Sequence, residues 1–323
     1  MNLLEKIKDV EKISVFSDGI LYKSSKNELF SLKEESVILL DKVYDYEVFN
    51  QTIFYQESNL EKLCLLNLYS QKKKFISGIF SLRGAFHINE NNIYILGKEN
   101  SSKVIYIFDT KTFLLKSITT ANYFPKLSAN NLCFCEKKDA IYCFDTLLNK
   151  NLWSYSLPEG FKIFGQVQMI DNLLILYAVD NNFDHSKTIA LDINSGNIKW
   201  ELDNTIFCQI DDEKKRLLGY AIRKYEVIDP FSGKIIVQKS MMDYYEKGLS
   251  PVSPSNTIAN GKLWFVSGRG ENAKFGRINI ETSQVDFIQD FPLQNNGQLS
   301  KPVFHNGKLY LLDSNNTLHI FEE

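Results

Sequence analysis

The chain has 323 residues, of which 44% are hydrophobic and 24% charged, and its formal net charge is −2 with a pI near 6.2. This composition is close to the globular average, which indicates a well-filled core and argues against disorder. The charge provides no field that would attract a phosphate backbone, so we expect no nucleic-acid partner.

The N-terminal segment MNLLEKIKDV is interrupted by Glu5, Lys6, Lys8 and Asp9, so it lacks the apolar core of a secretory signal. No stretch approaches the ~18 consecutive apolar residues of a membrane span. The five cysteines include no CxxC pair, a usage that fits reduced thiols. These features predict a cytoplasmic protein with no membrane partner.

A pattern of an apolar run, a turn and a second apolar run recurs along the chain, in residues 29–39, 65–75, 107–117, 143–153, 190–200, 227–237 and 277–287. The third residue of each copy is Ser31, Asn67, Asp109, Asp145, Asp192, Asp229 and Asn279 in turn, at spacings of 36, 42, 36, 47, 37 and 50 residues. Periods near 40 with strand content indicate a propeller or a related repeat array.

The residues of the best copy, ALDINSGNIKW (190–200), have a local explanation. The side chain of an Asp or Asn at the end of a strand can accept hydrogen bonds from backbone amides two residues on, which closes an Asx-turn. Gly196 and Gly233 supply the positive φ that the turn requires. Trp200 and Trp153 then provide large flat surfaces for packing against a neighbouring sheet.

A further pair of extended segments precedes each hairpin, so each unit is predicted to be four antiparallel strands, here named A to D, and the chain holds eight units. The last unit ends at TLHIFEE after strand C, and the N-terminal NLLEKI has the apolar spacing to supply its strand D. Such closure removes the open edges that promote aggregation. We predict an all-β, single-domain β-propeller over residues 1–323 with eight blades, or seven if residues 1–45 are irregular.

ALDINSGNIKW, with CFDTLLNKNLW and VIDPFSGKIIV, resembles the PQQ-like repeat of quinoprotein-alcohol-dehydrogenase-like propellers. In that family the Asp, the Ser/Thr-Gly turn and the Trp dock adjacent blades. The family's quinone enzymes are longer and exported, and they carry a vicinal cysteine pair and a calcium ion. This chain has no Cys-Cys pair, so we expect no quinone and no other cofactor.

The candidate catalytic and metal-binding motifs lack the residue spacing that such sites require. Cys133 and Cys135 alternate onto one face of a strand, with Cys143 on its partner, and we interpret them as buried thiols. The segment DNNFD (180–184) begins like a calcium loop, but His185 and Leu191 stand where glycine and glutamate are needed. The sequence GRGENAK (268–274) lacks the phosphate-loop spacing, and no Ser or Cys lies in a nucleophile elbow. We therefore expect no enzyme.

Function is expected on the face where the D–A and B–C loops emerge, because loops on a rigid scaffold vary freely. These loops are predicted at residues 122–126, 158–164, 180–187, 241–256 and 268–274. Aromatic residues, Met and Arg are enriched at protein contacts. The candidate partner-binding residues are Tyr123, Phe124, His185, Met241, Tyr244, Tyr245, Arg269 and Glu271.

Two functions remain open. The first is a non-enzymatic interaction propeller that binds a protein; small PQQ-like propellers without cofactor ligands resemble bacterial scaffolds or toxin-neutralising immunity proteins, which implies a toxin or effector as partner. The second is an enzyme or a carbohydrate- or small-ligand-binding propeller with its site in the central channel. Acidic groups and histidines at the channel mouth would favour the second, and an off-axis aromatic patch the first.

Overall fold

The computed structural model describes residues 1–16, 18–32, 36–49, 51–57, 62–77, 79–87, 92–99, 102–109, 112, 115–118, 124–129, 131–148, 150–251 and 253–322. Within them, the strands form eight antiparallel sheets, seven of four strands and one of five. Helical structure in this part of the chain is limited to α1 (Met242–Glu246) and to the 3-10 turns η1 (Ser253–Ser255) and η2 (Gly270–Asn272). The predicted all-β propeller of four-stranded antiparallel blades is confirmed.

The chain divides into two compact units. Unit 1 comprises Met1–Val10 and Pro158–Glu323, and unit 2 comprises Glu11–Leu157. That residues 1–323 form a single domain stays a prediction.

Unit 2 holds four sheets, whose strands follow one another in chain order. They are β2 (Val10–Phe16), β3 (Gly19–Ser24), β4 (Leu29–Leu32) and β5 (Ser36–Leu40); β6 (Val43–Phe49), β7 (Thr52–Glu57), β8 (Lys62–Asn67) and β9 (Lys73–Ser77); β10 (Ile79–His87), β11 (Asn92–Glu99), β12 (Ser102–Asp109) and β13 (Leu115–Ile118); and β14 (Phe124–Ala129), β15 (Leu132–Lys137), β16 (Ala140–Asp145) and β17 (Lys150–Ser156).

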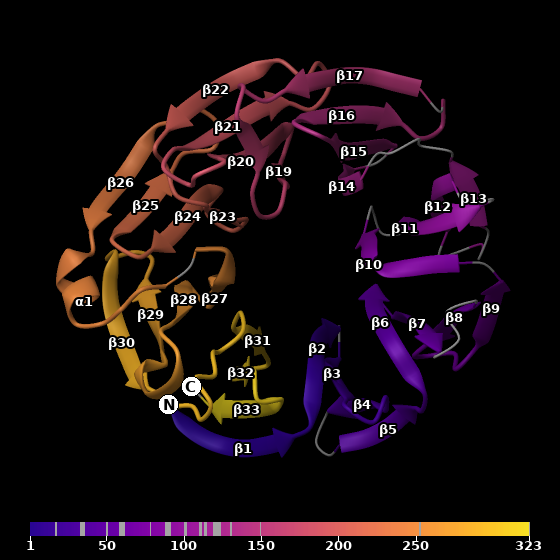
Figure 1. The fold of residues 1–323 in the computed structure, drawn as a ribbon, viewed down its shortest axis with the longest axis horizontal. Helices are drawn as coiled ribbons and strands as arrows, with labels where there is room; N and C mark the ends of the chain where they lie inside the picture. The colour runs from indigo at the N-terminus through magenta and orange to yellow at the C-terminus, as the bar shows by residue number, and fades with distance from the viewer. Residues whose placement is uncertain are drawn as a thin grey trace. The chain divides into compact units, whose positions relative to one another are not determined.

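Unit 1 also holds four sheets, shown from magenta to yellow in Figure 1 except for the indigo β1. They are β18 (Phe161–Ile163), β19 (Gln168–Ile170), β20 (Leu173–Asp180), β21 (Ser186–Asp192) and β22 (Ile198–Asp203); β23 (Gln209–Asp211), β24 (Arg216–Ala221), β25 (Lys224–Ile228) and β26 (Ile235–Ser240); β27 (Thr257–Ala259), β28 (Lys262–Ser267), β29 (Lys274–Asn279) and β30 (Gln284–Asp290); and β31 (Val303–His305), β32 (Lys308–Leu312), β33 (Thr317–Glu322) and β1 (Asn2–Lys8). The first of these has five strands because β18 and β19 both pair with β20.

The last sheet of unit 1 is completed by the N-terminus. Strand β1 pairs antiparallel with β33, with Asn2 opposite Glu322 and Lys8 opposite Thr317. Figure 1 shows the indigo β1 beside the yellow β33. The predicted role of NLLEKI as the missing strand D is therefore confirmed.

The repeated turns between strands C and D have the predicted chemistry. In five of them a side-chain Oδ1 accepts a hydrogen bond from the amide two residues on, at 2.8–3.1 Å; the acceptors are Asn67, Asp145, Asp192, Asp229 and Asn279. Gly196 and Gly233 both have φ of 71°. Ser31 differs, because it lies inside β4 and is buried.

Two successive sheets of unit 1 dock through the predicted tryptophan. Trp200, on β22, packs in a buried cluster with Leu217 and Ile228 of the following sheet. Its indole Nε1 donates a hydrogen bond to the carbonyl of Pro230 at 2.7 Å. The ring from one blade thus packs on the C–D turn of the next blade.

Candidate functional site

The B–C and D–A connections of unit 1 lie at the same ends of their strands, because the strands of each sheet alternate in direction. We name this set the loop surface. It comprises residues 181–185, 204–208, 222–223, 241–251, 253–256, 268–273, 291–302 and 313–316. Part of the segment predicted as a loop at 158–164 instead forms β18, which pairs with β20 through three residues.

The first connection of the loop surface carries His185, which is exposed. The loop is closed by Asp180: its Oδ1 accepts the amide of Asp184 at 2.8 Å, and its own amide donates to the carbonyl of His185 at 3.0 Å. Phe183 is exposed at a φ of 63°, with Lys162 Nζ 4.6 Å from its ring centroid. Asp180 thus stabilises a B–C turn, as the sequence suggested.

The segment 241–256 does not expose Met241, and this prediction is wrong. Met241 is only 1% exposed and packs in a core cluster with Tyr220 and Leu249. Its amide donates to the carbonyl of Arg223 at 2.8 Å, and the chain then forms α1. The short helix turns Met241 inward, because its apolar side chain fills the space between two sheets.

Tyr244 and Tyr245 are half-buried on α1, and they have different roles. Tyr244 packs against the same core cluster as Met241. The guanidinium of Arg223 lies over the ring of Tyr245, with its Cζ atom 4.5 Å from the ring centroid. Arg223 and its neighbour Ile222 are both exposed on the β24–β25 turn, and neither is among the residues predicted from the sequence. The signal in the sequence that would have identified both residues is a two-residue turn occupied by Ile and Arg.

The structure brings Arg269 and Glu271 together at a pocket of about 580 Å³. Residues 269–272 form one wall, and residues 292–296 form the other. Two backbone hydrogen bonds tie the walls: Gly270 N to Gly297 O at 2.7 Å and Leu293 N to Gly270 O at 2.9 Å. Both loops are therefore held in fixed conformations by each other.

Gly270 is required at this pocket for two reasons. Its φ of 55° is unfavourable for a side chain, and a Cβ atom there would lie 3.2 Å from Cα of Asn296. Asn295 and Asn296 follow with φ of 53° and 51°, in the left-handed region that Asn tolerates better than other side chains.

The pocket lining combines charged, amide and apolar groups. Its polar lining is a guanidinium, a carboxylate and carboxamides, with Leu293 as an apolar contact. Arg269 and Glu271 are exposed, and neither forms an ion pair with any side chain that the structure describes. This arrangement suits recognition of a partner's polar groups.

The remaining predicted residues are not tested. Tyr123 lies outside the described residues, and so does the side chain of Phe124, whose backbone begins β14.

The cysteines are buried free thiols. The Sγ atoms of Cys133 and Cys135 lie 3.4 Å apart, on one face of β15 as predicted. The hydrogen bond to Cys135 and burial raise the pKa of Cys133, and burial raises the pKa of Cys143 to about 12. Because the thiolate is the reactive form, these thiols are poor nucleophiles at neutral pH. Among the described residues, no three His, Cys, Asp or Glu side chains are grouped to hold a metal.

The A strands of unit 1 use polar side chains to bond successive sheets to one another. The links are Gln168 Nε2 to Cys208 O at 2.6 Å, Gln209 Nε2 to Asn256 O and Thr257 Oγ1 to Pro302 O at 2.6 Å. In addition, Lys301 Nζ, just before β31, lies 3.5 Å from Gln209 Oε1 of β23. These side chains are engaged in cross-links between blades, which reduces their capacity to bind a ligand.

No protein-family model and no curated protein sequence matches the chain. Solved structures do match it. BamB from Moraxella catarrhalis aligns with 100% of this chain and 97% of its own, at 12% identity and a TM-score of 0.62. The C-terminal WD40 domain of Sif2 aligns with 99% of this chain and 97% of its own, at 9% identity and a TM-score of 0.70. Hsv2 from Kluyveromyces lactis aligns with 88% of this chain and 100% of its own, at 11% identity and a TM-score of 0.54.

The fold is a β-propeller. At these identities the likeness defines the architecture, and one propeller scaffold carries many unrelated functions. Function therefore has to be argued from the loop surface itself. No helix of the described residues is both long and apolar enough to cross a membrane.

Proposed function

We propose that the chain is a non-enzymatic protein-interaction propeller whose loop surface binds a protein partner. The observation that carries the proposal is the pocket at Arg269 and Glu271. Two exposed opposite charges, which form no ion pair with the side chains that the structure describes, stand on backbone that is already fixed by hydrogen bonds between loops. A preorganised site loses little conformational entropy on binding, and charges of both signs select a partner with the complementary pattern.

A second anchor lies at Arg223 and Tyr245. The guanidinium lies over the ring, 4.5 Å from its centroid, and exposed Ile222 adds an apolar surface beside it. Arg and Tyr dominate binding hot spots because each combines a large contact area with polar groups. This anchor takes the place of Met241, which the fold buries.

We further propose that the repeats are of the PQQ-like type and that the protein acts in the bacterial cytoplasm as a scaffold or a toxin-neutralising immunity protein. The Asx-turns, the Gly turns and the docked Trp200 support the repeat type. The immunity role rests on the resemblance to small propellers without cofactor ligands, and it makes the partner a toxin or effector protein.

The test is affinity capture from a lysate of the producing cell, followed by measurement of the affinity of the captured protein. The double variant Arg269→Ala with Glu271→Ala should weaken binding about tenfold or more. The matched control is Glu213→Ala with Lys214→Ala, which removes the same charges from the exposed β23–β24 turn at the opposite strand ends.

Equal loss in both double variants, or no loss in either, would refute the loop surface as the binding site. If no protein is captured and the purified chain retains or converts a small molecule, the ligand-binding or enzymatic function replaces this proposal.

A further inference from the structure

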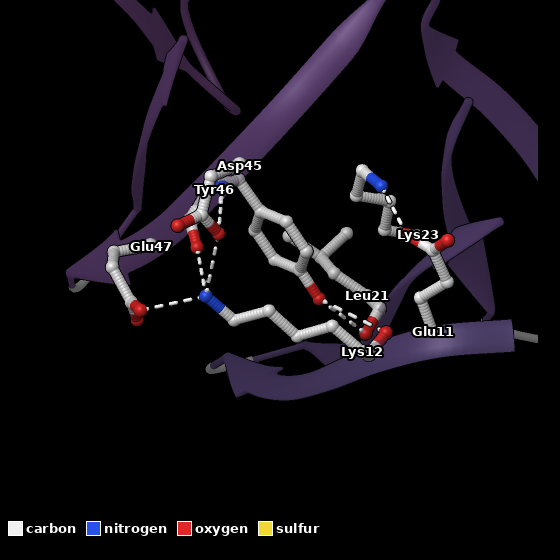
Figure 2. A network of polar contacts seen from close by, with 7 residues as sticks. All are labelled: Glu11, Lys12, Leu21, Lys23, Asp45, Tyr46 and Glu47. Carbon is white, nitrogen blue, oxygen red and sulfur yellow. Dashed lines mark hydrogen bonds and ion pairs between the residues drawn. The ribbon is translucent and has the colours of Figure 1, made fainter. Parts of the chain in front are cut away.

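A second pocket, of about 520 Å³, lies within unit 2. It forms where the start of β2, the β3–β4 hairpin and the start of β6 meet. Its lining residues are Glu11, Lys12, Lys23, Ser25, Asn27, Tyr44 and Asp45. Figure 2 shows the charged network on this side of the unit.

The walls of the pocket are fixed by Lys12 and Tyr46. Lys12 Nζ donates to Asp45 Oδ1 at 3.1 Å, to the carbonyl of Tyr46 at 2.5 Å and to Glu47 Oε1 at 2.6 Å (Figure 2). An ammonium has three N–H donors, so these three bonds leave Lys12 no donor for a ligand, and its side chain only lines the pocket. The hydroxyl of the fully buried Tyr46 donates to the carbonyl of Leu21 at 3.1 Å, which joins β6 to β3.

The other lining groups keep unused hydrogen-bonding capacity. Lys23 is only 5% exposed, and its ammonium has a single side-chain partner among the described residues, Glu11. Two N–H donors of Lys23 are therefore left over, and Glu11 keeps an oxygen free. The side chains of Ser25, Asn27 and Tyr44 add groups that both donate and accept.

The charges of this lining cancel. Lys12 and Lys23 are equal in number to Glu11 and Asp45, so the lining residues themselves carry no formal net charge. It does offer an aromatic surface, because Tyr44 is 49% exposed. Donors, acceptors and an exposed ring without net charge match a neutral ligand that is rich in hydroxyl groups.

We propose that this pocket binds a neutral sugar of one or two rings. Each sugar hydroxyl can accept from Lys23 and donate to Glu11 or Asp45, while the C–H face of the sugar ring packs on Tyr44. The pocket volume falls within the range of about 300–1,000 Å³ that is typical of small-ligand sites. None of the residues that line this pocket belongs to the loop surface, so the proposal does not depend on the protein partner proposed above.

The test is saturation-transfer NMR on the full chain with maltose, cellobiose and lactose, beside glucuronic acid and glucosamine as charged analogues. We expect transfer to at least one neutral sugar, with affinity reduced about tenfold or more in Lys23→Met and in Tyr44→Ala. Lys26→Met is the matched control, since it removes the same charge from an exposed position of the same hairpin and should bind as the parent does.

Tyr44→Ala keeps the test valid if the buried Lys23 substitution impairs folding, because Tyr44 is exposed. The proposal is overturned if none of the neutral sugars receives saturation, or if transfer persists unchanged in Tyr44→Ala. Stronger binding of glucuronic acid or glucosamine than of every neutral sugar would overturn it as well, in favour of an ionic ligand.

Discussion

A Cβ atom on Gly233 would lie 2.7 Å from the indole ring of Trp200, so the ring seats directly on the backbone of the next blade's turn. The same turn provides the Pro230 carbonyl that accepts the indole N–H. Trp200→Ala should lower the free energy of unfolding by about 3–5 kcal/mol, the range for removal of a large buried aromatic. Denaturant melts measure this, and a loss below about 1 kcal/mol would show that Trp200 does not dock the blades.

Gly233→Ala should also destabilise the protein, since the added Cβ meets the ring at a φ of 71°. Gly248→Ala is the control: its φ of 85° is equally unfavourable, but no atom lies within 4 Å of the added Cβ. The difference between the two melts isolates the contact with Trp200. Equal losses of unfolding free energy in the two variants would mean that the positive φ alone, without the contact with Trp200, explains why Gly233→Ala is destabilising.

Glu226 is a fully buried carboxylate with three donors. Its Oε2 accepts the amide of Ile206 at 2.9 Å, and its Oε1 accepts Gln238 Nε2 at 2.9 Å and Lys224 Nζ at 2.6 Å. Glu226→Ala leaves these donors unmatched and should cost about 3–5 kcal/mol in denaturant melts. Glu226→Gln keeps an acceptor and should cost less; a larger loss for Gln than for Ala would contradict this account.

Acid sensitivity is expected at the Asp229 turn. Hydrogen bonds from the Ser232 hydroxyl at 2.6 Å and the Phe231 amide at 3.0 Å hold the pKa of Asp229 below its usual value. The resulting stabilisation is present above the unfolded pKa of about 3.9 and is lost as pH falls through the folded pKa.

Asp229→Asn should therefore reduce the fall in stability below about pH 4 without unfolding the turn. Asn67 and Asn279 show that an amide oxygen can accept the same bond. Melting temperatures measured across the acid range provide the check. If the melting temperatures of Asp229→Asn and of the parent fall equally below about pH 4, protonation of Asp229 does not contribute to the loss of stability in acid.

Removal of residues 1–8 should expose the edge of β33, which now pairs with β1. Unpaired strand edges promote association between chains. Light scattering after size-exclusion chromatography should therefore detect oligomers or aggregates. A truncated chain that stays monomeric with an unchanged melting temperature would refute the role of β1 in closure.

The repeats were predictable because their chemistry is local. An Asx-turn such as that of Asp192 depends on residues within a few positions, and so does the Gly that follows it. The burial of Met241 was not predictable, since the orientation of this residue, just before α1, is set by packing against Tyr220 and Leu249.

The two pockets also differ in how far their lining residues could be predicted from the sequence. Arg269 and Glu271 could be predicted because they lie in one loop, although the opposite wall at 292–296 could not. The pocket at Lys23 was missed entirely, because its lining comes from three elements that only the fold brings together. A lysine directly after the apolar run GILY (19–22) was the available signal.

Hydrogen exchange of the chain with and without its captured protein partner tests the central claim most directly. The account predicts slower amide exchange at residues 241–247 and 268–273, where Tyr245, Arg269 and Glu271 lie, with little change at the C–D turns around Asp192 and Asp229. Protection confined to those C–D turns, with residues 268–273 unchanged, would contradict the loop surface as the binding site.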